Sequence, residues 1–439
     1  MRALILRTGT TIEPFGEHAG ESMVQFSTLR DYTDHNLAAG RFRAEAVDDP
    51  AGVAADDDEL VLILPDNLFV SQKAVRDFER AARAQTPARL ALRRTASVDF
   101  LIPVSDAQPV PLEPAQHESA RGGLARIERD ARERVDYDVF LVRGRDLPRG
   151  LDHAGLIAAL RQRCRPVVVS KREVVLPVRV PILGDSSAQT MDFPITSTLV
   201  CELRHWVHIL WLNQVAFGMR WMDLLRARKL WAIGRILSAF PFGRARVFKK
   251  LVRVGRGCSI HPTAHIEMSE LGDGVVVGPR ASIRNSFVGD GAVIGDHSVL
   301  LSSTVGAGAF ITPKTFLVWS AAYPGATIGN YKLQVSLVGR DAHVNAWAGL
   351  VDAKLKGDIR VPLAGEMRST GRQFLGSCVG HRAALAAKVL LQPGRMIPND
   401  AMVVMRPDEV ISEVPADLEP GVPLVRDHGT LVPLSTLKP

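Results

Sequence analysis

Asp66 is the first residue whose position in the sequence suggests chemistry. It follows the apolar run L-V-L-I-L-P, which is typical of a buried strand, so its carboxylate lies where a strand ends. At such an end a carboxylate can hold Mg²⁺ against a phosphate, because hard cations take oxygen ligands and share the phosphate oxygens of a substrate. A single Asp after a strand is equally common as a turn-forming or helix-capping residue. The sequence leaves both roles open.

Four cysteines carry further reactive groups, at Cys164, Cys201, Cys258 and Cys378. They lie too far apart for any pair to hold a tetrahedral metal from one loop, so we expect free thiols in a reducing compartment. The opening stretch M-R-A-L-I-L-R-T-G-T has too short an apolar run for a signal peptide, and no long uncharged run follows it. We therefore expect a cytoplasmic protein.

Short apolar runs alternate with helical stretches over residues 1–200. The chain has 439 residues, 46% apolar and 23% charged, which indicates a globular protein of two or three domains. Apolar runs near residues 3, 60, 135 and 166 are separated by helical stretches that include 75–84 and 155–164. This alternation predicts a mostly parallel α/β sheet with ligands at the carboxyl ends of its strands, where Asp66 lies.

From residue 254 onward the sequence repeats with a short period. An apolar residue followed by glycine recurs every 17 residues, at Val254, Leu271, Val288 and Val305, and the apolar position repeats six and twelve residues later. A six-residue period is typical of a parallel β-helix in which each strand forms one side of a triangular coil. The apolar residue points into the prism, and the glycine turns a corner where a side chain would clash or φ must be positive.

These patterns define the expected domain organisation. We expect an α/β domain over 1–200, a helical linker over 201–253, a left-handed parallel β-helix of hexapeptide repeats over 254–404 and a C-terminal cap or tail over 405–439. The repeat breaks over 340–375 and then resumes. Insertions in solenoids usually build the binding face, so the break predicts a loop that leaves the prism and carries function.

The formal charge of +7 comes from one segment of the chain. Residues 220–256 contain eleven Lys and Arg and one acid, a local charge of +10, which leaves the rest at −3. A basic segment with Trp221 and Trp231 can pack between two domains with its arginines in solvent, lie on an anionic membrane surface, or bind an anionic ligand. Its apolar residues spread around much of a helical wheel, which favours packing between domains. Because the charge is confined to this segment, we expect no nucleic-acid binding.

With these three parts in this order, the chain resembles the bifunctional sugar-1-phosphate nucleotidylyltransferase/acetyltransferase family. The resemblance is carried by L-P-D-N-L-F-V-S around Asp66, by I-H-P-T-A from Ile260, and, over 354–400, by K-L-K-G-D-I-R-V, G-E-M-R-S-T-G-R-Q-F-L-G, V-G-H and P-G-R-M-I-P. It implies a Rossmann-like N-terminal domain of the GT-A nucleotidyltransferase type, with Asp66 holding Mg²⁺. It also implies an acyltransferase-like β-helix that uses acetyl-CoA or another acyl-CoA.

The first loop departs from the family pattern. The family has a glycine-rich L-A-A-G-x-G-T-R, whose backbone N–H groups cradle a triphosphate while the basic side chain neutralises it. Here the loop is L-R-T-G-T-T, with Gly9 as its single glycine and no basic residue after the two threonines. Arg7 is the candidate to replace the missing cation. The loss of two glycines and a cation should weaken triphosphate binding, because charge-assisted contacts are the strong ones.

The β-helix half departs from the pattern at the general base. The family has a histidine where the matching stretch here, I-T-P-K-T-F-L-V-W-S, places Lys314. An imidazole takes a proton from an amine at neutral pH, whereas a lysine does so only when it is desolvated. His297 is the nearest histidine upstream and the second candidate base, and His343 and His381 lie in later coils. Histidines at the turns of hexads are also commonly structural.

Two further stretches match the family's donor site. Asn330 and Tyr331 resemble an Asn-Tyr pair that borders the acetyl donor, and Lys354, Lys356 and Arg360 match a basic loop that faces the donor's phosphates. A solvated charged hairpin is the alternative for that loop. The resemblance also implies a homotrimer, since the family's acyl sites lie between neighbouring β-helices.

The leading hypothesis is a transferase of sugar-nucleotide metabolism that acts on a sugar-1-phosphate or sugar nucleotide through a nucleotidyltransferase-like site, an acyltransferase site, or both. The alternative is a catalytically degenerate relative that serves as a trimeric sugar-nucleotide-binding or scaffold protein, with peripheral membrane contact through 220–256. The altered first loop and the missing histidine favour the alternative, and the matched loop over 354–400 favours the transferase.

Overall fold

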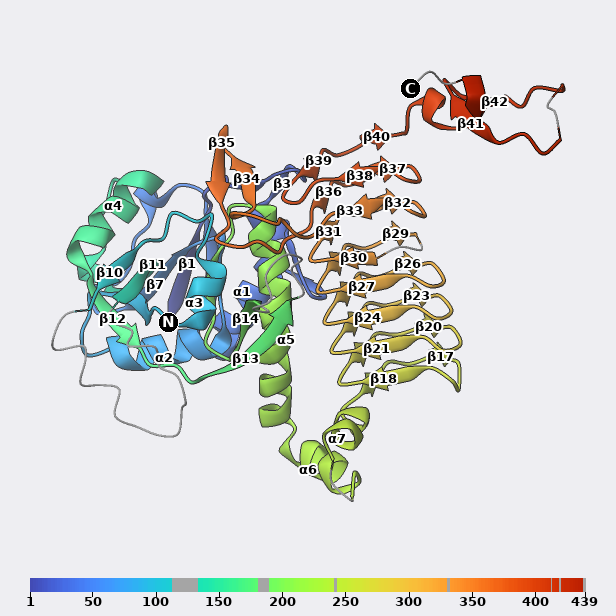
Figure 1. The fold of residues 1–439 in the computed structure, drawn as a ribbon. Coiled ribbons are helices and arrows are strands. Elements are labelled where there is room, and N and C mark those ends of the chain that lie inside the picture. The colour runs from blue at the N-terminus through green and yellow to red at the C-terminus, as the bar shows by residue number, and fades with distance from the viewer. Residues whose placement is uncertain are drawn as a thin grey trace.

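The computed structural model describes residues 1–112, 133–180, 189–240, 243–329, 332–411, 413–417 and 420–436 of the chain. An α/β half and a tall β-helix stand side by side, and the long helix α5 (Trp206–Ala227) runs between them (Figure 1). The predicted fold class is confirmed: α/β in the first half and a left-handed parallel β-helix in the second.

The α/β half is built on a seven-stranded sheet with the order β12-β9-β11-β7-β1-β6, and β10 pairs with β11. All its path strands are parallel except β11, which is antiparallel to both neighbours. The strands are β1 (Arg2–Leu6), β6 (Arg43–Val47), β7 (Leu60–Pro65), β9 (Ala88–Arg93), β10 (Pro109–Pro111), β11 (Glu133–Arg143) and β12 (Arg165–Val169). Short pairs around it are β2–β3 (Thr11–Ile12, Glu17–His18), β4–β5 (Met23–Val24, Ser27–Thr28), β8–β15 (Leu68–Val70, Val200–Glu202) and β13–β14 (Glu173–Val180, Gln189–Thr196).

Helices cover both faces of this sheet because its strands are apolar on both sides. Alternate residues of β7 enter two different cores, Leu62 and Leu64 on one face and Val61 and Ile63 on the other. The helices are α1 (Leu29–Ala39), α2 (Gln72–Ala82), α3 (Ala96–Leu101) and α4 (His153–Arg163), with α2 packed on the first face and α4 on the second. In this arrangement of one sheet between two layers of helices, the carboxyl ends of β1 and β7 lie at the same edge of the sheet, next to the first loop.

The β-helix has three sheets whose strands pair in register every 17 residues through most of the prism. The first sheet contains β16 (Arg253–Val254), β19 (Glu270–Leu271), β22 (Phe287–Val288), β25 (Thr304–Val305), β28 (Ala321–Ala322), β31 (Leu337–Val338), β36 (Cys378–Val379) and β39 (Met396–Ile397). The second contains β17 (Ser259–Ile260), β20 (Val276–Val277), β23 (Val293–Ile294), β26 (Phe310–Ile311), β29 (Thr327–Ile328), β32 (His343–Val344), β37 (Ala384–Leu385) and β40 (Met402–Val403). The third contains β18 (His265–Glu267), β21 (Ser282–Arg284), β24 (Val299–Leu301), β27 (Phe316–Val318) and β30 (Lys332–Gln334), and β33 (Gly349–Leu350) pairs with β38 (Leu390–Leu391) above it.

Two glycines per coil have different tasks at the corners. A Cβ added to Gly255, which directly follows the inward apolar residue, would lie 2.3 Å from the carbonyl oxygen of Gly272 in the next coil. Gly257, two residues later, has φ +67° with open space around it. The first glycine is therefore required by close stacking of the coils and the second by backbone conformation.

A column of buried serines also stitches the coils together. The members are Ser269, Ser286, Ser303, Ser320, Ser336 and Ser377. Each backbone N–H from Ser286 onward donates to the hydroxyl of the serine one coil earlier, at 3.1–3.2 Å. These hydroxyls satisfy buried backbone groups at a corner where the strand ladders stop.

The excursion from the prism begins later than the sequence pattern indicates. Strands β32 and β33 lie within 340–375, yet both belong to a regular coil. The chain leaves the prism after Leu350 and forms the hairpin β34 (Arg360–Leu363) and β35 (Glu366–Ser369), which reaches over the α/β half (Figure 1). Beyond β40 the chain ends in the hairpin β41 (Leu424–Asp427) and β42 (Thr430–Pro433).

Three helices make up the connection between the halves: α5, α6 (Lys229–Leu237) and α7 (Arg244–Lys250). The first part of α5 is buried around its whole circumference, since Trp206–Ala216 is buried throughout. It joins Phe69 of the α/β half to Leu337 and Cys378 of the β-helix in one core. Packing between the domains, one of the three roles expected for residues 220–256, is made there by Trp221 and Leu251, which share a small core with Phe287 of the β-helix. Arg220 is not simply solvated, because the guanidinium pairs with Glu270 at 2.9 Å.

A second contact between the halves is made by the loop after β2. The ring of Phe15 stacks on Tyr323 and His381 of the β-helix, with centroids 5.2 and 4.5 Å apart. Glu17 accepts a hydrogen bond from the Tyr323 hydroxyl and lies 3.2 Å from His381 Nε2.

Among the described residues, no helix is long and apolar enough to cross a membrane. The four cysteines are free thiols, as expected.

Candidate functional site

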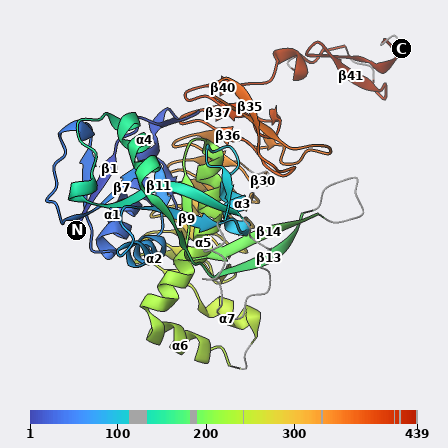
Figure 2. The ribbon, with the colours of Figure 1, turned by 90° about the vertical axis from the view of Figure 1, so that its left-hand side faces the viewer.

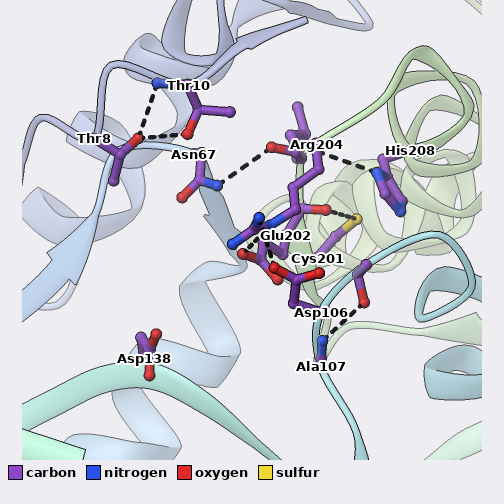
Figure 3. Close-up of polar contacts among 12 residues, drawn as sticks. Thr8, Thr10, Asn67, Asp106, Ala107, Asp138, Cys201, Glu202, Arg204 and His208 are labelled. Carbon is purple, nitrogen blue, oxygen red and sulfur yellow. Dashed lines mark hydrogen bonds and ion pairs between the residues drawn. The ribbon is translucent and has the colours of Figure 1, made fainter. Parts of the chain in front are cut away.

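Asp66 lies directly after β7, where its carboxylate faces the first loop. Oδ1 accepts hydrogen bonds from the backbone N–H of Thr8 at 3.0 Å and from its hydroxyl at 2.8 Å, and Thr8 in turn contacts Thr10 (Figure 3). Oδ2 lies 3.5 Å from His18 Nε2. The end of β7 and the first loop therefore meet, and the backbone N–H and hydroxyl of Thr8 point at Asp66.

Oδ1 of Asp66 thus already accepts two hydrogen bonds from Thr8, and Oδ2 faces His18. The residues that the structure describes contain no group of three or more His, Cys, Asp or Glu that could hold a metal, so Asp66 as a metal ligand stays a prediction. The role of Asp66 in this structure is to hold the first loop against β7, close to the turn-forming role that the sequence left open.

The cavity beside Asp66 is small. It has a volume of about 160 Å³ and is lined by residues that include Arg7, Arg30, Asp34 and Asp66. Ligand pockets for nucleotide-sized molecules have about 300–1,000 Å³. Arg7 pairs with Asp48 at 3.1 Å, and Gly9 takes φ +68° to turn the loop. Of the two predicted nucleotide-binding residues, Arg7 lines this cavity and Gly9 lies on the same loop, and the volume of the cavity is below the usual range of ligand pockets.

A polar cluster next to this loop was not expected from the sequence. Arg204 pairs with Glu202 and Asp106, each at 2.7 Å, and Asn67 donates to the backbone of Leu203 (Figure 3). Asp106 also pairs at 3.2 Å with Arg368 of the inserted hairpin. The cluster ties the inserted hairpin of the β-helix to the edge of the α/β half. Asp106 and Arg368 are 262 residues apart, so no local sequence pattern reveals their contact.

His297 and Lys314 occupy equivalent turns of successive coils, at the corner between the second and third sheets. Both have positive φ, +59° and +63°, and both are exposed. Their backbone N–H groups donate to Pro279 and Asp296 in the preceding coil. The two predicted bases are thus neighbours on the outside of the prism, in the same column as Arg280.

The two later histidines differ in their surroundings. His343 is exposed on β32. His381 is buried in the contact between the halves, where its Nδ1 accepts the N–H of Arg340. With Glu17 and Phe15 against its ring, His381 has a structural task.

The basic loop residues line the larger of the two cavities described here. Lys354, Lys356 and Arg360 surround a cavity of about 560 Å³ together with Arg395, and Ile359, Leu355, Met367 and Pro393 supply apolar walls. The cavity lies between the excursion from the prism and the turn that precedes β39. Side-chain hydrogen bonds to the backbone help to fix the shape of the loop. Lys354 Nζ donates to the carbonyl of Asp358, and the guanidinium of Arg395 donates to the carbonyl of Arg360. Arg395, on the P-G-R-M turn, was not among the predicted residues.

The structure brings Lys354, Lys356 and Arg360 together and leaves the candidate bases elsewhere. The cavity lies at the corner between the third and first sheets, whereas His297 and Lys314 lie at the corner between the second and third sheets, in earlier coils. One chain alone does not join these two groups. Asn330 and Tyr331 lie outside the described residues.

No protein-family model matches the chain. No curated protein matches it either. Solved structures with a similarity include a Bacillus cereus protein classed as an acetyltransferase (16% identity, 36% of this chain, 79% of that chain, TM-score 0.18) and a hexapeptide transferase family protein from Anaplasma phagocytophilum (21%, 35%, 78%, 0.18). A variant of perosamine N-acetyltransferase from Caulobacter crescentus, in complex with CoA and GDP-perosamine, shows 20% identity over 34% of this chain and 52% of that chain, with a TM-score of 0.16. Scores this low carry no argument, so the β-helix rests on the chain's own sheets.

Proposed function

We propose that this protein is an acyltransferase that uses an acyl-CoA to acylate a sugar nucleotide or a related phosphorylated sugar, and that the activity belongs to the β-helix half. The observation that carries the proposal is the cavity lined by Lys354, Lys356, Arg360 and Arg395. Its volume of about 560 Å³ falls within the range of ligand pockets.

The lining of this cavity fits the chemistry of the donor. Acyl-CoA carries phosphates, and four cations within one cavity supply the charge-assisted contacts that phosphates require. The apolar walls suit the less polar part of the same molecule. A sugar-1-phosphate alone would leave these walls without a partner.

His297 is the better candidate for the base. An acceptor amine or hydroxyl gives its proton to the neutral imidazole as it attacks the thioester carbon; the C–S bond then breaks and the CoA thiolate takes up a proton. Lys314 is exposed in the next coil and offers a positive charge on the same column as His297. In this proposal Lys314 attracts the phosphate of the acceptor.

The proposal requires a second copy of the chain, because cavity and base lie at different corners of one prism. A homotrimer in which the His297 corner of one β-helix meets the cavity corner of its neighbour would join them. Apolar side chains on the open sheets, among them Val276, Phe310 and Phe316, suit such a contact. The α/β half then serves as support, consistent with its small cavity and with an Asp66 that is occupied by protein donors.

A non-catalytic scaffold is the second candidate function. The observation that favours it is the exposure of His297 and Lys314, at a corner away from the cavity within the chain. On this reading the basic cavity binds a phosphorylated ligand without turnover.

Calorimetry with CoA, followed by a thiol-release assay with acetyl-CoA and a panel of amino-sugar nucleotides, separates these functions. We expect Lys354→Gln/Lys356→Gln/Arg360→Gln to weaken CoA binding by roughly tenfold or more, because it removes three charge-assisted contacts. A matched control, Arg76→Gln/Arg80→Gln/Arg83→Gln, removes three cations from α2 and should bind CoA like the unaltered protein.

The outcomes are distinct. CoA binding with thiol release that His297→Ala abolishes supports the acyltransferase. CoA binding without release from any acceptor supports the scaffold. If the unaltered protein binds no CoA, or if the control variant loses as much affinity as the cavity variant, the donor site is wrong.

A further inference from the structure

Helix α6 exposes apolar side chains in an unusual concentration. Leu230 is 87% exposed, Leu237 61% and Ile233 53%, and Phe240, three residues beyond the helix, is 75% exposed. Single exposed apolar residues are ordinary, but clustered ones mark an interaction surface. Leu230, Ile233 and Leu237 together with Ile236 form what we call the α6 outer face.

The outer face is one continuous side of the helix. At 100° per residue, Leu230, Ile233, Ile236 and Leu237 fall within an arc of about 120°. Trp231, on the opposite side, packs against the small core formed by Trp221, Leu251 and Phe287, and Ala232 is buried next to it in the sequence. The helix is therefore anchored by its inner side, which holds the outer face toward solvent.

Basic residues surround the outer face without acidic neighbours in sequence. Residues 224–252 contain eight Lys and Arg and no Asp or Glu. Arg228, Lys229, Lys249 and Lys250 are exposed. Arg220 and Arg253, just outside this stretch, both pair with Glu270, so the acidic groups nearby are already engaged on the inner side.

The position of α6 leaves this face accessible. Helices α6 and α7 project beyond the first coil of the β-helix and beyond the α/β half, at the end of the molecule opposite the C-terminal hairpin (Figures 1 and 2). An apolar face with a cationic rim at a projecting end matches an anionic bilayer surface, where apolar side chains enter the headgroup boundary and cations meet lipid phosphates.

We propose that the α6 outer face docks this protein on anionic membranes, with α6 lying in the plane of the interface. A second copy of the chain is the less favourable occupant, because pairing two such faces brings cationic rims of the same sign together. The docking is peripheral, since a nine-residue helix is far too short to span a bilayer.

Vesicle flotation with the full-length protein tests this proposal. We expect binding to phosphatidylcholine vesicles that contain phosphatidylglycerol, weaker binding to phosphatidylcholine alone, and release by about 0.5 M salt. The variant Leu230→Ser/Ile233→Ser/Leu237→Ser should bind at least roughly tenfold more weakly, and Lys229→Gln/Lys249→Gln/Lys250→Gln should lose most of the preference for the anionic lipid.

A matched control uses exposed apolar residues at the other end of the molecule. Leu390→Ser/Met402→Ser/Val404→Ser removes side chains that are equally exposed, and it should float like the unaltered protein. Because all of these positions are exposed, the variants should keep the circular dichroism spectrum of the fold. No flotation with either vesicle, or equal loss in the control and the outer-face variant, overturns the proposal. A lower particle mass by light scattering for the outer-face variant than for the unaltered protein and the control also overturns the proposal, since the face would then hold a second copy of the chain.

Discussion

Arg372 lies between the aromatic rings of Phe100 in α3 and Trp211 in α5, although it belongs to the excursion from the β-helix. Its Cζ is 3.9 Å from the ring centroid of Phe100 and 4.1 Å from that of Trp211, and a guanidinium N–H donates to the Phe100 carbonyl. Burial lowers the pKa of Arg372 to about 9. A cation between two rings with little water is a strong contact, so this side chain fastens the excursion to α3 and α5.

Replacing Arg372 should therefore destabilise the whole chain. We expect Arg372→Ala to lower the free energy of unfolding by about 2–3 kcal/mol, because it loses the stacking and leaves a void between the rings, and Arg372→Lys to cost less. Urea unfolding at pH 7 measures the effect. Arg360→Ala, an exposed cation on the same hairpin, is the control and should change little. Equal stability of Arg372→Ala and the control variant would contradict the contact's contribution.

Individual residues differ in how well the sequence located them. Asp66 was placed correctly because a strand end is a local pattern, and Lys354, Lys356 and Arg360 were grouped correctly because they are close in sequence. Arg372 and Arg395 were missed because their neighbours come from distant segments. The sequence predicts glycines at the corners either to avoid a side-chain clash or to allow a positive φ. Both reasons hold, but for different glycines: close stacking for Gly255 and positive φ for Gly257.

At the scale of elements, α5 is held at its N-terminus by two buried histidines. His205 Nε2 lies 3.0 Å from the carbonyl oxygen of Pro362 in β34, and His208 Nε2 lies 2.9 Å from that of Pro103. Burial lowers the pKa of His205 to about 3 and that of His208 to about 4. Both rings are therefore neutral in the folded protein at neutral pH, and each links α5 to a different part of the molecule.

These histidines predict acid sensitivity. An unfolded histidine takes up its proton near pH 6.5, so between pH 6.5 and 4 the unfolded chain binds more protons than the folded one. Their stabilisation is complete above pH 6.5 and is lost as the pH falls, by about 1.4 kcal/mol per pH unit for each histidine. Urea unfolding at pH 7, 6 and 5 measures this slope. His208→Gln should be less stable at pH 7 and should show a shallower slope; an unchanged slope would refute the assignment.

The basic segment shows what a single helical wheel leaves out at the scale of elements. Taken as one helix, its apolar residues point in all directions. The structure breaks it into α5, α6 and α7, so Trp221 faces an inner core while Leu230 and Leu237 face solvent. The break at Arg228 lacks a Pro or Gly signal, which is why the sequence did not locate it. The coils, in contrast, were predicted almost residue by residue, because a six-residue period leaves few alternatives.

At the scale of the whole molecule, the two halves share one core. Buried residues from the loop after β2, from the early turns of α5 and from the first sheet of the β-helix belong to a single cluster, which includes Phe15, Trp211 and Leu337. Neither half covers this surface alone. The sequence predicts two domains because its two patterns are distinct, and it favours packing of the basic segment between them, but periodicity reports on local structure and does not identify the residues of the shared core.

We therefore expect one cooperative unfolding transition for the full chain, with circular dichroism and tryptophan fluorescence changing at the same urea concentration. A fragment that begins at Val254 would expose the first sheet, including the buried Ala321, Tyr323 and Leu337, and should aggregate or bind a hydrophobic dye. A fragment that ends before α5 should likewise lack a stable core at Phe69. Two separate transitions in the full chain, or a soluble fragment from Val254 that unfolds with the same midpoint as the full chain, would show instead that the shared core adds little and that the halves fold independently.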